Sequence, residues 1–138
     1  MIYSDYIRIN TEGKNEITDI SPDVRDLLGK SGIKNGSVLV FVPGATGALT
    51  TIEFEPGLIS DFPELMEKLI PEAGDFQHNR TWGDGNGHSH LRASMIGPSL
   101  TIPVIEGELI LGTWQQIIFL EFDNKPHNRR IVVQVSGE

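Results

Sequence analysis

The sequence of 138 residues contains no cysteine. This absence excludes disulfide bonds, thiolate-bound zinc and a cysteine nucleophile. Basic residues are also scarce, with 11 Lys and Arg against 19 Asp and Glu and a formal net charge of -8 at pH 7. Such a chain lacks the broad basic face that contact with a DNA or RNA backbone requires. We therefore expect no nucleic-acid partner.

Long hydrophobic runs are missing as well. No apolar stretch approaches the roughly 20 residues that cross a bilayer. The first residues, Met1 to Asp5, lack the basic and apolar regions of a signal peptide. The sequence therefore predicts no membrane partner and a cytoplasmic location. Its hydrophobic content of 38% and charged content of 22% are typical of a globular chain. Its length suits a single domain over residues 1–138.

Two helices are predicted in the first half of the chain. Apolar residues recur at helical spacing up to Gly32, with Ser21 as the expected N-cap and Pro22 at the first helical position. These signals favour a helix over residues 21–31. A second helix is predicted before Pro71, because an apolar stripe recurs there at Phe62, Leu65, Met66, Leu69 and Ile70.

The remaining periodic segments read as strands. They are residues 3–10, 37–42, 49–55, 99–104, 108–121 and 130–135. The continuous apolar run at 37–42 predicts a strand buried on both faces. The segment 108–121 is expected to be one long or bent strand with Trp114 in the core. Arg129 and Arg130 could face a neighbouring subunit or an anion, but a solvated turn is favoured for them.

These elements predict an α+β fold with a mostly antiparallel sheet, sandwich-like or barrel-like, and two or three short helices. Helices so few and so short cover only part of such a sheet. We therefore expect an oligomer to bury the remainder.

The segment from Gly74 to Gly87 is predicted to be a loop, and it begins a histidine-rich region. His78, His88 and His90 lie there, with Asp84 between them. Imidazoles and carboxylates are the ligands that a divalent transition metal prefers when no thiolate is present. The three histidines are therefore candidate metal ligands.

Residues 87–96 leave two structures open. Asn86 as an N-cap and Gly97 as a stop favour a helix, on which His88 and His90 diverge by about 200°. His78 and one of the two would then be the better metal pair. A strand would instead place His88, His90, Arg92 and Ser94 on one face.

The glycine-rich stretch Gly83–Gly87 precedes this predicted helix. Glycines let backbone amides approach a ligand, and a helix N-terminus favours anions. Arg80 and Arg92 lie on either side, and guanidinium groups hold phosphate or carboxylate by paired hydrogen bonds. The stretch therefore predicts a site for a small anionic or phosphorylated molecule.

Three further polar residues are candidates for this site. Ser99 could donate a hydrogen bond to a phosphate, although it could equally cap a turn. Gln115 could reach the site from a strand, and Glu53 could act as a general base or as a ligand. No serine lies in a Gly-x-Ser-x-Gly elbow, so covalent catalysis has no visible nucleophile.

Several of these segments together form a recognisable pattern. They are His78, residues 84–94 (DGNGHSHLRAS), 96–103 (IGPSLTIP), 111–115 (LGTWQ) and 129–134 (RRIVVQ). The pattern resembles the YjbQ-like family, also called the secondary thiamine-phosphate synthase family, and Thr50 and Glu53 fit it upstream. The form of residues 51–57 (TIEFEPG) is similar to the archaeal-type branch.

The resemblance implies a trimer-forming α+β fold with a polar pocket around the histidine-rich segment, holding a metal or an anion. It also implies a weak thiamine-phosphate synthase activity, which joins an aminopyrimidine methyl pyrophosphate to a thiazole phosphate. We therefore predict a metal-assisted homotrimeric enzyme that acts on a phosphorylated small molecule. The alternative prediction is a non-catalytic trimer that binds a metal or a metabolite.

The predicted site residues fall into three groups. The catalytic group is Glu53, His90 and Arg92. The ligand-binding group is Asp84, Gly85, Asn86, Gly87, Ser99 and Gln115. The ligands of a divalent metal, Zn²⁺ or Mg²⁺, are His78, His88 and His90.

Overall fold

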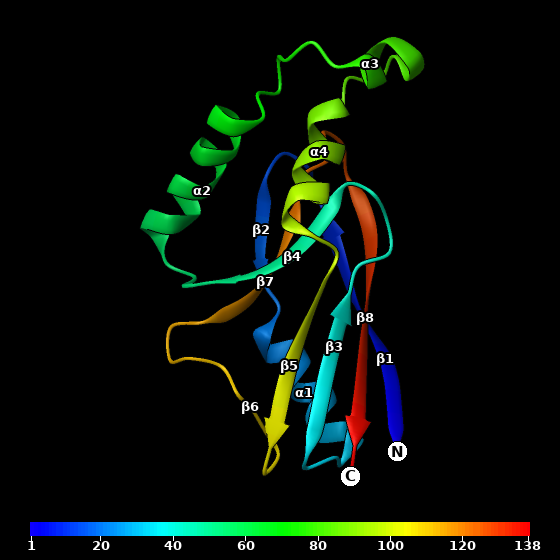
Figure 1. The fold of residues 1–138 in the computed structure, drawn as a ribbon, viewed down its shortest axis with the longest axis vertical. Coiled ribbons are helices and arrows are strands. Elements are labelled where there is room, and N and C mark those ends of the chain that lie inside the picture. The colour runs from blue at the N-terminus through cyan, green and yellow to red at the C-terminus, as the bar shows by residue number, and fades with distance from the viewer.

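The computed structural model describes residues 1–138 and contains two antiparallel β-sheets and four helices (Figure 1). The strands are β1 (Ile2–Thr11), β2 (Glu16–Asp19), β3 (Gly36–Phe41), β4 (Gly47–Ile52), β5 (Ser99–Ile105), β6 (Glu108–Leu109), β7 (Gln116–Glu121) and β8 (His127–Gly137). The helices are α1 (Ser21–Ser31), α2 (Pro56–Leu69), α3 (Gln77–Trp82) and α4 (Gly87–Ile96). The predicted α+β class is confirmed.

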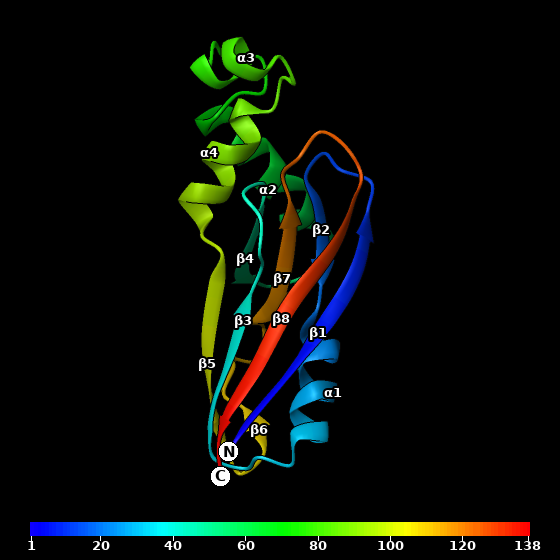
Figure 2. The same ribbon diagram turned by 90° about the vertical axis from the view of Figure 1, so that its right-hand side faces the viewer.

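The two sheets differ in size and in surroundings. The larger sheet has the strand order β1-β8-β3-β5-β6, and the smaller one has the order β2-β7-β4. Figure 1 shows α2, α3 and α4 gathered at one end of the molecule, with both chain termini at the other end. In the side view of Figure 2, the larger sheet runs from the end that holds the termini up to the helical end, and α1 lies beside its lower half.

β7 is the strand that the core surrounds on both faces. Ile117 and Phe119 belong to the main apolar cluster, which lies between the sheets and includes residues of α1. Ile118 and Leu120 point the other way, into a second cluster formed with α2 and α4. All five residues from Ile117 to Glu121 are therefore buried. A continuous apolar run is the pattern expected of such a strand.

The prediction that residues 37–42 are buried on both faces is wrong. On β3, Val38 and Val40 are buried, whereas Phe41 is 39% exposed and Leu39 is only partly buried. The alternation arises because β3 lies in the larger sheet, which packs on the core by one face only. Its other face is open to solvent.

The ends of two helices are formed differently from the prediction. Ser21 is the first residue of α1 rather than its N-cap, and its hydroxyl oxygen accepts a hydrogen bond from the Ile117 amide at 2.7 Å. Gly32 ends α1, as predicted, and it does so in the left-handed conformation. Asn86 precedes α4, but its side chain makes no capping bond to the helix.

Three further expectations need correction. Residues 77–82, predicted as loop, form α3, so the chain has four helices rather than two or three. The segment 108–121 is not one strand, because β6 ends at Leu109 and the intervening turn leaves Trp114 70% exposed. Arg129 is buried rather than solvated. None of the four helices has the length and apolar character needed to span a lipid bilayer.

Candidate functional site

The short helix α3 packs against the start of α4 at the helical end of the molecule. The side-chain oxygen of Asn79 accepts a hydrogen bond from the Gly87 amide at 2.9 Å, which satisfies a free N–H group at the start of α4. The chain reverses between the helices at Gly83, whose φ of +71° is easy only for glycine. No local pattern in the sequence marks Asn79 as a capping residue.

This packing brings His78 on α3 beside His90 on α4. Their ring centroids are 4.4 Å apart, and the ring planes are inclined at 45°. The Nδ1 atom of His78 lies 3.6 Å from a carboxylate oxygen of Asp84 and has no hydrogen-bond partner. The side chains of His78 and Asp84 remain 29% and 42% exposed. The two imidazoles and the carboxylate thus lie near one another at a surface that solvent reaches.

His88 does not join this pair, because α4 is a helix and turns His88 toward the interior. The side chain is only 3% exposed, and its Nδ1 atom has no hydrogen-bond partner. Burial, and then the nearby charge of Arg92, lower the pKa of His88 below its usual 6.5. His88 is therefore neutral at pH 7. No three His, Asp or Glu side chains form a cluster that could hold a metal ion.

Arg92 is also turned inward and is almost completely buried. Its guanidinium group donates to the Ile70 carbonyl, with distances of 2.9 and 2.6 Å from Nε and Nη2. It also donates to Asn15 at 3.0 Å and to Glu67 at 2.8 Å. Arg92 thus joins α4 to the end of α2 and to the β1–β2 turn. It does not share a surface with His90.

A cavity of about 520 Å³ lies between α4 and the loop that joins β3 to β4. Its lining residues are Gly44, Ala45, Gly47, His90, Leu91, Ala93, Ser94 and Pro98. His90 is the one titratable residue in this lining, and no Lys or Arg contributes to it. The cavity thus offers an imidazole, a hydroxyl and a wall of small and apolar groups.

The glycine-rich stretch between α3 and α4 is held by the turn that joins β7 to β8. Asn86 donates to Asp123 at 3.2 Å, and Asn124 donates to the Asp84 carbonyl at 3.1 Å. The Gly87 amide is already bonded to Asn79. One of the backbone donors that the sequence suggested for an anion is therefore occupied within the protein.

Asp123 is the carboxylate at the centre of this attachment. Burial alone would raise the pKa of Asp123, but hydrogen bonds from His127, Asn86 and the Asn124 amide outweigh it and lower the pKa to about 2. The His127 ring approaches the carboxylate at 2.6 Å. Asp123 is therefore ionised at neutral pH, and it anchors Asn86 at the start of α4.

A buried ion pair lies beneath the β3–β4 loop. Arg129 donates from Nε and Nη2 to the two carboxylate oxygens of Glu121, at 2.8 and 2.5 Å. Its Nη2 also donates to Thr46, whose hydroxyl donates to Asp123. A continuous polar network therefore runs from β7 and β8 to the start of α4. Glu121 and Asp123, which follow the apolar run of β7, were the sequence signal for this network, because a buried carboxylate needs a partner.

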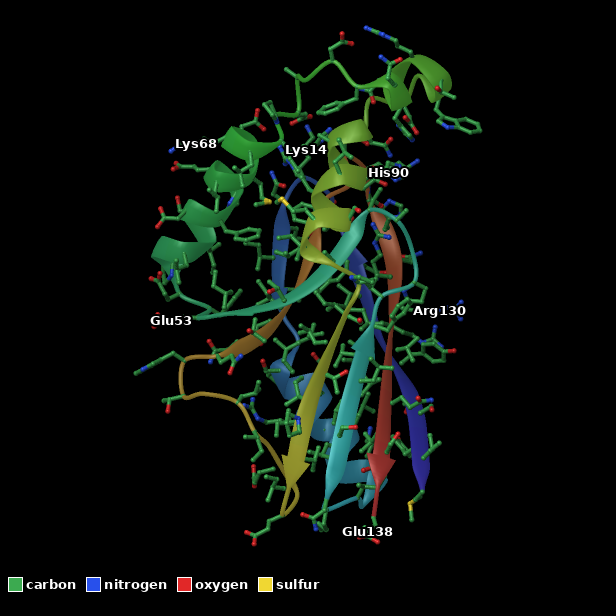
Figure 3. All side chains as sticks on the ribbon, in the orientation of Figure 1. Lys14, Glu53, Lys68, His90, Arg130 and Glu138 are labelled. Atoms are coloured by element: carbon green, nitrogen blue, oxygen red, sulfur yellow. The ribbon has the colours of Figure 1, made fainter.

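Three of the predicted site residues do not line the cavity. Glu53 is exposed after the end of β4, and Figure 3 shows it on the opposite side of the structure from His90. Gln115 lies in the turn before β7 and donates to the Thr51 hydroxyl at 3.1 Å. Ser99 is exposed at the start of β5, opposite Phe41. Of the predicted site residues, the structure therefore brings together His78, His90 and Asp84.

These features define a small α+β protein in which two antiparallel sheets support a helical end that carries two adjacent histidines. The chain matches the model of the family described as "UPF0047 protein YjbQ-like" over residues 5–138, and it belongs to this family.

Its relatives share nearly the whole chain. A UPF0047 protein of Methanothermobacter thermautotrophicus is 41% identical over 99% of this chain and 94% of its own length. One from Archaeoglobus fulgidus is 41% identical over 93% of this chain and 97% of its own. Both sources are archaeal, in agreement with the archaeal-type resemblance of the sequence.

Solved structures share the fold. A crystal structure of a YbjQ-like protein of unknown function from Sulfolobus solfataricus P2 superposes with a TM-score of 0.95 and 37% identity, covering 100% of this chain and 99% of that one. A hypothetical protein from Aeropyrum pernix K1 gives a TM-score of 0.92 and 35% identity, covering 99% of both chains.

Proposed function

We propose that His78, His90 and Asp84, together with the adjoining cavity, bind a divalent transition metal and a phosphorylated small molecule. The chain would then be a metal-assisted enzyme, with thiamine-phosphate synthase as the specific candidate. The observation that carries this proposal is the 4.4 Å separation of the two imidazole rings beside a carboxylate.

The donor atoms suit zinc better than magnesium. Two imidazoles and a carboxylate are common zinc ligands, whereas Mg²⁺ favours a shell made of oxygen atoms. The Nδ1 atom of His78 has no hydrogen-bond partner in the protein, so its lone pair is not used by another side chain. A catalytic zinc usually has three protein ligands and one water. Because no three such side chains cluster here, water or substrate oxygens would have to supply more of the coordination than in that arrangement.

A bound metal would also supply the positive charge that a phosphorylated ligand needs. No cationic side chain lines the cavity, because Arg92 is committed to Ile70 and Arg129 to Glu121. Affinity for phosphate or pyrophosphate should therefore depend on the metal. This dependence separates the proposed site from one built on arginines.

The chemistry of the candidate reaction agrees with the side chains present. The bond between the pyrimidine methylene carbon and pyrophosphate breaks, and the thiazole nitrogen forms the new bond to that carbon. The nitrogen carries no proton, so this step needs no general base. The requirement is charge stabilisation on the departing pyrophosphate, which a bound metal ion supplies. The position of Glu53, away from the cavity, is compatible with such a reaction.

A non-catalytic role in binding a metal or a metabolite is the second candidate. It is favoured by one observation, namely that two of the three predicted catalytic residues, Glu53 and Arg92, do not line the cavity. Tight binding of zinc and pyrophosphate without turnover of the two thiamine precursors would support this role over the enzymatic one.

A homotrimer is part of the proposal. Apolar side chains remain about half exposed along one face of α4, with Leu91 at 49% and Met95 at 50%. Exposed apolar groups of this size commonly mark contacts between subunits. Analytical ultracentrifugation should give the mass of three chains, and a monomer at micromolar concentration would contradict this part of the proposal.

The test is a zinc titration of purified protein, followed by a pyrophosphate titration with zinc and with a chelator. The wild-type protein should bind zinc, and chelation should abolish pyrophosphate binding. His78→Ala and His90→Ala should each lose both. Arg25→Gln is the control, because Arg25 is exposed on α1, away from the site. If the two alanine variants bind zinc as tightly as the control does, the proposed site is wrong.

A further inference from the structure

The solvent-facing surface of the larger sheet carries two arginines side by side. β1 and β8 are antiparallel, and their register places Arg8 directly opposite Arg130. Both side chains are exposed, and both lie on the face opposite to that of Ile7 and Ile131, which are buried. Residues opposite each other on neighbouring strands have Cβ atoms about 5 Å apart. The two guanidinium groups therefore share one small area of the surface.

Neither arginine has an acidic partner within the chain. The ion pairs of the protein involve Lys30, His78, Arg80, Arg92, His127 and Arg129, but not Arg8 or Arg130. Like charges placed directly opposite on a sheet are destabilising. Asp5, Asp23 and Asp26 line a neighbouring hollow together with Arg8, but none of them forms an ion pair with its guanidinium group.

The surroundings of the pair are suited to receive an anion. A shallow cavity of about 440 Å³ is lined by Arg8, Ile9, Asn10, Asn128, Arg129 and Arg130. Asn10 and Asn128 form the next pair on the same face of the sheet and add amide donors. The charge of Arg129 is already neutralised by Glu121, so Arg8 and Arg130 supply the net positive charge.

Arg130 is also held in place by an aromatic ring. Its guanidinium carbon lies 5.4 Å from the centroid of the Tyr6 ring, within the range of a cation–π contact. In Figure 3, Arg130 lies beside the strands of the larger sheet, and His90 lies above it at the helical end. The linings of the arginine cavity and the histidine cavity have no residue in common.

We propose that Arg8 and Arg130 form a second binding site, which takes the phosphate group of a small molecule. A phosphate dianion fits better than a carboxylate, because it compensates two positive charges and offers oxygens to both guanidinium forks. The site would exist whether or not the histidine cavity binds metal, so it goes beyond the proposed function.

The test uses inorganic phosphate as the probe, in phosphate-free buffer with a chelator and in a His90→Ala background. Binding is followed by calorimetry and by the side-chain Nε–H signals of the arginines. The parent protein should bind phosphate, and Arg8→Gln or Arg130→Gln should each weaken binding roughly tenfold. Arg25→Gln is the control, because Arg25 is exposed on α1 and lies outside the cavity. Its affinity should equal that of the parent.

Thermal unfolding gives a second readout. Phosphate should raise the Tm of the parent protein, since a ligand that binds only the folded state stabilises it. Arg8→Gln should keep or raise the Tm without phosphate, because a like-charge contact is removed, and it should lose the rise with phosphate. The proposal is overturned if the parent does not bind phosphate or if Arg25→Gln weakens binding equally. It is also overturned if Arg8→Gln dissociates the oligomer, because the pair would then serve contact with a second copy.

Discussion

The ring of His90, on α4, lies 4.4 Å from the ring of His78, on α3. The two helices are joined only by the turn at residues 83–86, and that turn is held to the β7–β8 connection by Asn86 and Asn124. The position of each imidazole therefore depends on backbone that the β-sheets anchor. A metal or ligand at this surface would meet groups that are already in place.

Asp84→Asn should weaken zinc binding while leaving the fold intact. The carboxylate lies 3.6 Å from His78 Nδ1, so it either binds the metal or orients the imidazole. Loss of such a group costs about 10-fold to 100-fold in metal affinity. The measurement is competition with a chromophoric chelator. Asp75→Asn is the control, because Asp75 pairs with Arg80 instead. Equal affinities in the two variants would remove Asp84 from the site.

Arg92→Gln should destabilise the protein by roughly 3 kcal/mol or more, because breaking a buried charged network leaves its partners unpaired. The Ile70 carbonyl would lose both of its guanidinium donors. Urea unfolding at pH 7 provides the measurement. Arg25→Gln, on the exposed face of α1, should stay within about 0.5 kcal/mol of the wild type. The folded fraction of Arg92→Gln should still bind zinc. Full stability combined with lost zinc binding would instead assign Arg92 to the site.

Arg129 and Glu121 should show strong energetic coupling. Each single replacement, Arg129→Met or Glu121→Leu, should cost about 3–5 kcal/mol, because it leaves one buried charge without a partner. The double variant should cost much less than the sum of the two. The exposed pair Lys30–Asp26, 3.1 Å apart, is the comparison and should couple by no more than about 0.5 kcal/mol. Additive effects at Arg129 and Glu121 would contradict the buried pair.

His88 should make stability fall as the pH drops below neutrality. Its pKa in the folded protein is lowered by burial and by Arg92. The unfolded chain therefore takes up a proton near pH 6.5, before the folded chain does, and the free energy of unfolding decreases from that pH downward. His88→Gln should flatten this part of the profile between pH 7 and about 5.5. An NMR titration that finds the His88 ring protonated above pH 6.5 would refute the prediction.

Elements with a strong local pattern were predictable from the sequence. The α1 segment shows an apolar repeat that ends at Gly32, and β8 shows strict alternation that places Ile131, Val133 and Val135 in the core. The helix at 87–96 was favoured over the strand and is confirmed as α4. That outcome separates His88 from His90, as the helical alternative predicted.

The remaining features depend on contacts between distant segments. α3 has only six residues and no buried side chain, so it lacks the apolar stripe that identifies a helix. The sequence around Arg129 is typical of a polar turn. Its hydrogen-bond partners in the interior, Glu121 and Thr46, lie on other segments, so no local pattern indicates that Arg129 is buried. Trp114 has the composition of a core residue, yet the turn between β6 and β7 leaves it in solvent. Of the candidate site, the residue types were predictable, but not which of them meet.

Gly87 leaves room for nothing larger than hydrogen where α4 meets α3. A β-carbon at this position would lie 2.7 Å from the Cβ of Phe76 and 3.0 Å from the side-chain oxygen of Asn79. Any side chain at this position would push α3 and α4 apart and increase the distance between the imidazoles of His78 and His90. The spacing on which a shared ligand depends is thus set by a residue that has no functional group of its own.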